Sequence, residues 1–190
     1  MRHMQTQVLL NYWRRTRGEQ SAPQKSEIEP RDIKTHLAFS FLLKREASDR
    51  FTFALAGTGL CDLFGRELRG QSFVHLWAEQ SRDAATISVV RVTNLSVPTV
   101  ALCVAETADQ RPLSGELLLL PYASERGETN WVFGHFQSLE PLSRLHGRKL
   151  VRMRMGASAI LTGDAHGPND VDFVNVKKST SHLRVVSART

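Results

Sequence analysis

Cysteine and long apolar runs are scarce in this 190-residue sequence. Its only two cysteines, Cys61 and Cys103, lie far apart without CxxC spacing. This excludes a disulfide framework and a cysteine-based zinc site, and it suits a reducing compartment. No stretch approaches the roughly 20 apolar residues that a membrane-spanning helix requires, and no small-residue cleavage site follows the short apolar stretch near the N-terminus. We therefore expect a soluble, cytoplasmic protein.

The motifs of common catalytic sites are also missing. The sequence contains no G-x-S-x-G, no H-E-x-x-H and no P-loop, and no spacing predicts a nucleophile, a base and an orienting acid in one place. We expect no enzymatic activity, no catalytic residue and no metal site.

Gly57-Thr58-Gly59 follows an alternating apolar segment, as the start of a dinucleotide-binding loop would. Such a loop needs G-x-G-x-x-G inside a strand–helix–strand unit. Here Asp62 takes the place of the third glycine, and its negative charge would repel a pyrophosphate. We expect the two glycines to form only the joint between a strand and a helix.

Positive charge is concentrated near the C-terminus. Residues 141–190 contain 9 Lys+Arg and 3 Asp+Glu, whereas residues 1–140 contain 16 of each, so the net charge of +6 belongs to the C-terminal segment. Its first part interleaves apolar residues with Arg144, Arg148, Lys149, Arg152 and Arg154. This is typical of a nucleic-acid arm, an anionic-membrane anchor or a docking segment for an acidic partner. A solvated tail fits equally well, and we expect 141–190 to be a basic, flexible tail.

Hydrophobic periodicity predicts both helices and strands. Residues 5–16 have the spacing of an amphipathic helix, and Pro30 with Asp32 is typical of a short helix start. Residues 83–95 fit helical spacing despite their β-branched residues, and we predict a helix. Strands are expected at 39–44, 51–57, 98–107, 113–123 and 130–139. This order predicts an α+β domain with helices covering one face of an antiparallel sheet.

Short motifs distributed along the chain strengthen this prediction. They are Tyr12-Trp13, the stretch Ile28-Glu29-Pro30-Arg31-Asp32-Ile33, Leu55-Ala56-Gly57-Thr58, Leu63-Phe64-Gly65-Arg66-Glu67-Leu68 with Gly70, and Leu76-Trp77. Together with the element order, they make residues 12–140 similar to a PAS domain, in particular to compact bacterial members that stand alone behind an N-terminal helix. The resemblance implies a PAS-like five-stranded antiparallel sheet with short helices on one face. It divides the chain into an N-terminal helix and linker (1–26), a PAS-like domain (27–140) and the basic tail (141–190).

The resemblance also implies where a small ligand would bind. In a PAS-like fold the short helices wall the cavity, so the candidate pocket residues are Leu60, Phe64, Phe73, His75 and Trp77. His135 is a further candidate, because an alternating strand can point it into a pocket. Packing of a core would use the same apolar residues. Heme, a familiar PAS cofactor, would bind through His75, whereas the sequence around Cys61 does not match the flavin-binding motif. The identity of a cofactor stays open.

A cluster of large apolar residues on the N-terminal helix predicts self-association. Leu9, Tyr12 and Trp13 lie near one another at helical spacing, and we expect them to form a homodimer interface. We therefore expect a non-enzymatic regulatory or sensory module that contacts a signalling partner, such as the histidine kinase that the family resemblance implies. The alternatives are a small-ligand sensor and an adaptor that binds nucleic acid or membrane through its tail.

Overall fold

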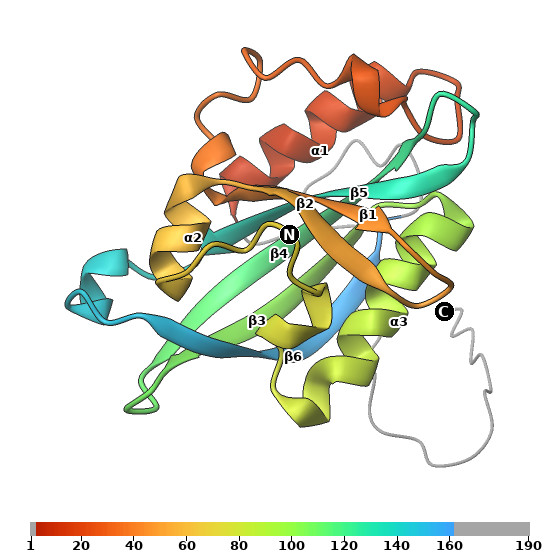
Figure 1. The fold of residues 1–190 in the computed structure, drawn as a ribbon. Coiled ribbons are helices and arrows are strands. Elements are labelled where there is room, and N and C mark those ends of the chain that lie inside the picture. Colours follow the sequence, from red (N-terminus) through yellow and green to blue (C-terminus); the bar gives the residue numbers. More distant parts are fainter. Residues whose placement is uncertain (1–2, 162–190) are drawn as a thin grey trace, which may run out of the picture.

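The computed structural model describes residues 3–161, which form an antiparallel sheet with helices packed on it (Figure 1). The strands pair in the order β2-β1-β5-β4-β3-β6. They are β1 (Ser40–Arg45), β2 (Phe51–Ala56), β3 (Thr99–Thr107), β4 (Pro112–Ala123), β5 (Thr129–Ser138) and β6 (Leu150–Ile160). The α-helices are α1 (Met4–Arg17), α2 (Thr58–Phe64) and α3 (Glu79–Leu95), and the 3-10 turns are η1 (Lys25–Glu27), η2 (Leu37–Phe39), η3 (Phe73–Leu76) and η4 (Leu142–Leu145).

Alternation of side chains along the strands gives the sheet two buried faces. On β4, Leu117 and Leu119 pack with α2, η3 and α3, and we call this side of the sheet the inner face. Leu118 and Leu120 pack with α1 on the opposite side, the outer face. The helix at 83–95 and the five expected strands are thereby confirmed, and no helix of the described part is long and apolar enough to cross a membrane.

The helix α1 is anchored on the outer face of its own sheet. Leu9, Tyr12 and Trp13 are all buried there, and the Trp13 indole Nε1 donates a hydrogen bond of 2.8 Å to the Pro121 carbonyl. The prediction that these three residues form a homodimer interface is therefore wrong. An amphipathic pattern shows that a helix covers an apolar surface, but it does not show which surface that is.

The segment expected to begin a flexible tail adds a sixth strand to the sheet. β6 pairs antiparallel with β3, and its Leu150 and Met153 side chains enter the inner-face core. Arg152 and Arg154, which alternate with the methionines, stay at the surface. The predicted boundary at residue 140 and the five-strand count are thus corrected, whereas the remainder of the expected tail lies outside the described residues.

The predicted short helix around Pro30 is replaced by a series of tight turns. The Ile33 N–H bonds to the Pro30 carbonyl, and the His36 N–H bonds to the Ile33 carbonyl at 2.8 Å. These contacts join residues three apart, as in 3-10 turns, and leave the chain free to cross from α1 to β1.

Candidate functional site

The interior below α2, η3 and α3 is filled by aromatic rings. The structure brings four of the predicted pocket residues together in this core: Leu60, Phe64, Phe73 and Trp77. Phe41 and Phe53 join them, with ring centroids 5.3 Å apart, and the Phe73 and Trp77 centroids are 5.7 Å apart. The four residues thus meet where the resemblance implied a cavity, and they meet in van der Waals packing.

Two glycines in the central strands make room for these rings. A Cβ at Gly134 on β5 would lie 2.0 Å from Cζ of Phe41, and a Cβ at Gly115 on β4 would lie 2.3 Å from Cε2 of Phe136. Both separations are shorter than any real carbon–carbon contact, so each ring lies directly on backbone. The close approach of rings to the sheet closes the inner face.

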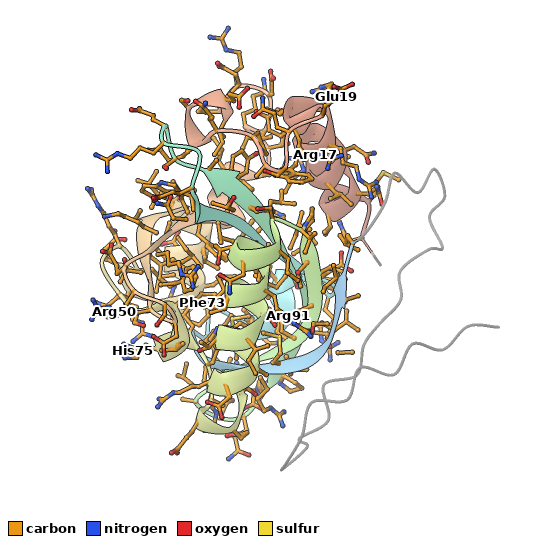
Figure 2. All side chains as sticks on the ribbon, turned by 90° about the vertical axis from the view of Figure 1, so that its right-hand side faces the viewer. Arg17, Glu19, Arg50, Phe73, His75 and Arg91 are labelled. Carbon is orange, nitrogen blue, oxygen red and sulfur yellow. The ribbon has the colours of Figure 1, made fainter. Side chains whose placement is uncertain are left out.

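His75 does not point into this interior. It lies on η3 two residues after the buried Phe73, and its side chain is exposed at the surface (Figure 2). The local turn directs Phe73 inward and His75 outward. Heme ligation by His75, considered from the sequence, therefore lacks the required placement.

His135 lies on the outer face, away from the other predicted pocket residues. Its ring packs edge-on against His36, with centroids 5.5 Å apart, and its Nδ1 lies 3.0 Å from the Ser40 hydroxyl oxygen. Because that hydroxyl donates its only proton to the His36 carbonyl, at 2.9 Å, we assign the His135 proton to Nδ1.

The His36–His135 pair is held without charge. Both Nε2 atoms are buried with no hydrogen-bond partner among residues 3–161. Burial lowers the pKa of His135 to about 4, and the neighbouring His36 ring contributes further. Burial also lowers the pKa of His36. Sequence reasoning missed His36 because nothing in its local pattern indicates which strand it covers.

Gly57 and Gly59 have a steric role, as the prediction of a strand–helix joint anticipated. Gly57 caps the seven-residue helix α2 with an ordinary negative φ of −68°. A Cβ on Gly57 would lie 2.0 Å from the Leu37 carbonyl oxygen, and a Cβ on Gly59 would lie 2.9 Å from Cε1 of Phe39. The glycine pair therefore lets α2 pack directly on η2.

The five basic residues named in the expected tail form contacts within the chain. Arg152 and Arg154 both pair with Glu106 on β3, whose side chain is only 9% exposed. The remaining three pairs are Arg144 with Glu140, Arg148 with Asp109, and Lys149 with the Asp62 carbonyl. All five cations thus have a partner oxygen within the chain, and four of them pair with a carboxylate.

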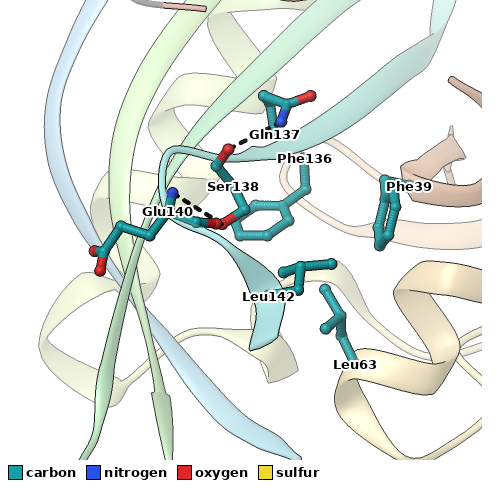
Figure 3. Close-up of a pocket in the computed structure, with 7 residues that line it drawn as sticks. All are labelled: Phe39, Leu63, Phe136, Gln137, Ser138, Glu140 and Leu142. Carbon is teal, nitrogen blue, oxygen red and sulfur yellow. Dashed lines mark hydrogen bonds between the residues drawn. The ribbon is translucent and has the colours of Figure 1, made fainter. Parts of the chain in front are cut away.

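A small pocket opens at one end of the sheet, between η2, α2, β5 and η4 (Figure 3). Its volume is about 120 Å³, and it is lined by Phe39, Leu63, Phe136, Gln137, Ser138, Glu140 and Leu142. None of these was predicted as a site residue. Six of them come from η2, α2, β5 and η4, and Glu140 lies between β5 and η4.

A model of the PAS domain family matches residues 1–137. The chain belongs to the PAS domain family, which confirms the predicted resemblance and fold class. The match ends before η4 and β6, so the sixth strand lies outside the matched region. A search of curated proteins finds no match to this chain.

Several solved structures are similar to part of this chain at low sequence identity. The LOV domain of the blue-light photoreceptor aureochrome 1 is 12% identical, covering 57% of this chain and 80% of that chain with a TM-score of 0.46. A LOV protein of Rhodobacter sphaeroides is 12% identical, covering 62% and 72% with a TM-score of 0.45. VqmA of Vibrio cholerae is 11% identical, covering 60% and 52% with a TM-score of 0.45.

Proposed function

We propose that this PAS domain protein is a non-enzymatic, cytoplasmic regulatory module that acts by contacting a signalling partner. The aromatic core of the inner face carries the proposal. The rings of Phe41 and Phe136 pack against Gly134 and Gly115 and fill the centre of the fold. The geometry therefore favours a protein that acts through contacts at its surface. The family resemblance makes a histidine kinase the partner class to test first.

We place the partner contact on the solvent side of α1. Met4 is 77% exposed and Val8 47% exposed, one helical turn apart, while the opposite side of the helix is buried on the sheet. An anchored helix that presents two apolar side chains loses little conformational freedom on binding. A homodimer through this same side of α1 replaces the interface expected from Leu9, Tyr12 and Trp13.

Substitution of the two exposed residues tests the proposal. Full-length Met4→Glu/Val8→Glu should lose crosslinking to the partner in the native host, with the partner identified by mass spectrometry. Leu95→Glu is the matched control, because Leu95 is 56% exposed on α3. Solution mass measured in parallel separates a second copy from a different protein. Equal capture of the same partner by all three proteins would contradict the placement on α1.

The ion pairs of the basic segment weigh against the adaptor alternative. A nucleic acid or membrane would have to compete with Glu106, Asp109 and Glu140 for the arginines that already bind them. A small-ligand sensor is a second candidate, supported by the pocket at the end of the sheet.

A further inference from the structure

The pocket in Figure 3 forms where two neighbouring strands end at different points. Pairing between β1 and β5 stops at Ser40 and His135, whereas β5 continues to Ser138. The last three residues of β5 therefore have no β1 residue opposite them. The chain before β1 turns into η2 and carries Phe39 to the side of the pocket.

Four apolar side chains from four elements surround the same space. Phe39, Leu63, Phe136 and Leu142 come from η2, α2, β5 and η4, and Figure 3 shows them gathered around it. An aromatic ring placed here would contact apolar carbon on several sides.

Two glycines leave the space that two of these side chains occupy. Gly59 on α2 leaves room for the Phe39 ring, since a Cβ there would approach it to 2.9 Å. Gly115 leaves room for Phe136, which a Cβ would approach to 2.3 Å. A side chain at either position would push a ring out of its present site, so the shape of the pocket depends on both glycines.

The polar side of the pocket carries no unbalanced charge. Glu140 accepts a hydrogen bond of 3.0 Å from the Ser114 N–H and pairs with Arg144. The Gln137 Nε2 donates to the Ser138 carbonyl at 2.9 Å, at the edge of β5 that β1 leaves uncovered. An ionised ligand would have to break the Glu140–Arg144 pair to be neutralised, and therefore an uncharged ligand fits better.

We propose that this pocket binds an uncharged molecule with a single apolar ring and one amide-like polar group. The ring lies among Phe39, Leu63, Phe136 and Leu142, and the polar group meets the Gln137–Ser138 edge. An apolar cavity of about 150 Å³ holds one benzene molecule, so the 120 Å³ of this pocket has room for at most one ring and excludes a larger cofactor. This ligand site rests on the second candidate function, the small-ligand sensor, and is independent of the partner contact proposed on α1.

Titration with benzamide tests the proposal on the full-length protein. Methyl signals of Leu63 and Leu142 should shift saturably in NMR spectra, with intermolecular contacts from the benzamide ring to both methyl groups. Leu142→Trp fills the pocket and should raise the Kd at least about tenfold. Leu95→Trp, at the exposed last residue of α3, is the control and should bind as the natural sequence does.

Three results would overturn the proposal. They are the lack of a saturable shift up to about 10 mM benzamide, ring contacts to methyl groups elsewhere in the protein, and an unchanged Kd in a folded Leu142→Trp variant. If Leu142→Trp fails to fold, the intermolecular contacts in the natural sequence decide the question alone.

Discussion

At the scale of single residues, the buried histidine pair makes folding depend on pH. The pKa of His135 is about 4 in the folded protein against an ordinary 6.5. The unfolded chain therefore binds the proton first as pH falls. The stabilisation is fully present above about pH 6.5 and is lost progressively as pH falls towards 4. Over this pH range, the shifted pKa of His135 changes the free energy of unfolding by about 3 kcal/mol.

Replacement of His135 should weaken the dependence of the free energy of unfolding on pH. In urea unfolding between pH 7.5 and 4.5, His135→Asn should lose less stability on acidification than the natural protein, because asparagine does not titrate. The lowered pKa of His36 leaves a smaller slope in the same direction. His75→Asn, at an exposed position, should keep the natural profile. If His135→Asn keeps the full slope, the assignment is wrong.

Gly134 should tolerate no side chain while Phe41 lies on it. Gly134→Ala forces the ring away from backbone that it now touches, and we expect a loss of about 1–3 kcal/mol in the free energy of unfolding. Because the cost comes from one contact, Phe41→Leu/Gly134→Ala should be more stable than the sum of the single changes implies. Urea denaturation of the four proteins measures this coupling, and strict additivity would contradict it.

At the scale of elements, one carboxylate adds two ion pairs to the backbone pairing of β6 with β3. Glu106 is nearly buried and pairs with Arg152 and Arg154, which are about half exposed. Glu106→Gln removes the negative charge and leaves Arg152 and Arg154 as neighbouring cations without it. We expect the free energy of unfolding to fall by about 1–2 kcal/mol. Hydrogen exchange should accelerate in β6 and stay unchanged in β5.

Asp109→Asn provides the matched control for this experiment. Asp109 also pairs with two arginines, Arg111 and Arg148, but it is exposed. Its replacement should leave exchange in β6 nearly unchanged. Equal effects of the two substitutions would show that burial of Glu106 does not matter.

Much of the element order follows from sequence periodicity, whereas the choice of partner surfaces does not. Alternation placed β1 to β5, and helical spacing placed α1 and α3. The burial of Trp13 could not be foreseen, because the Pro121 carbonyl that receives its hydrogen bond lies 108 positions away. Arg152 and Arg154 alternate with Met153 and Met155, which is closer to strand than to helix periodicity, but the prediction for this segment was a flexible tail. The net positive charge of this segment favoured a solvated tail, because the carboxylate that compensates it, Glu106, belongs to another strand.

The candidate site shows the same limit. The PAS resemblance predicted that Phe64, Phe73 and Trp77 line a pocket, because the short helices wall the cavity in that fold, but ring packing fills their shared space. The open pocket instead depends on where β1 stops relative to β5. Strand register is a property of the paired sheet, and no local pattern around Phe39 or Leu142 contains it.

At the scale of the whole molecule, the charge distribution predicts weak attraction to nucleic acid from the paired arginines. Each free cation that contacts a phosphate adds about one to the slope of the logarithm of the binding constant against the logarithm of the salt concentration. Arg144→Gln/Arg148→Gln should change that slope by less than about one, since both arginines already pair with carboxylates. Salt-dependent retention of the full-length proteins on immobilised DNA measures it. A decrease of about two would show that both arginines bind phosphate.

The two outer strands of the sheet are bonded to the same connecting segment. The Phe53 N–H on β2 bonds to the Gln71 carbonyl, and the Ala78 N–H bonds to the Met153 carbonyl on β6. Residues 71–78 thus contact both edge strands of the sheet through backbone hydrogen bonds. Open strand margins recruit other chains into aggregates. A chain that stops at residue 149 lacks β6, so one edge of β3 is left unpaired. We expect this shortened chain to aggregate, seen as light scattering, at concentrations where the complete chain stays clear.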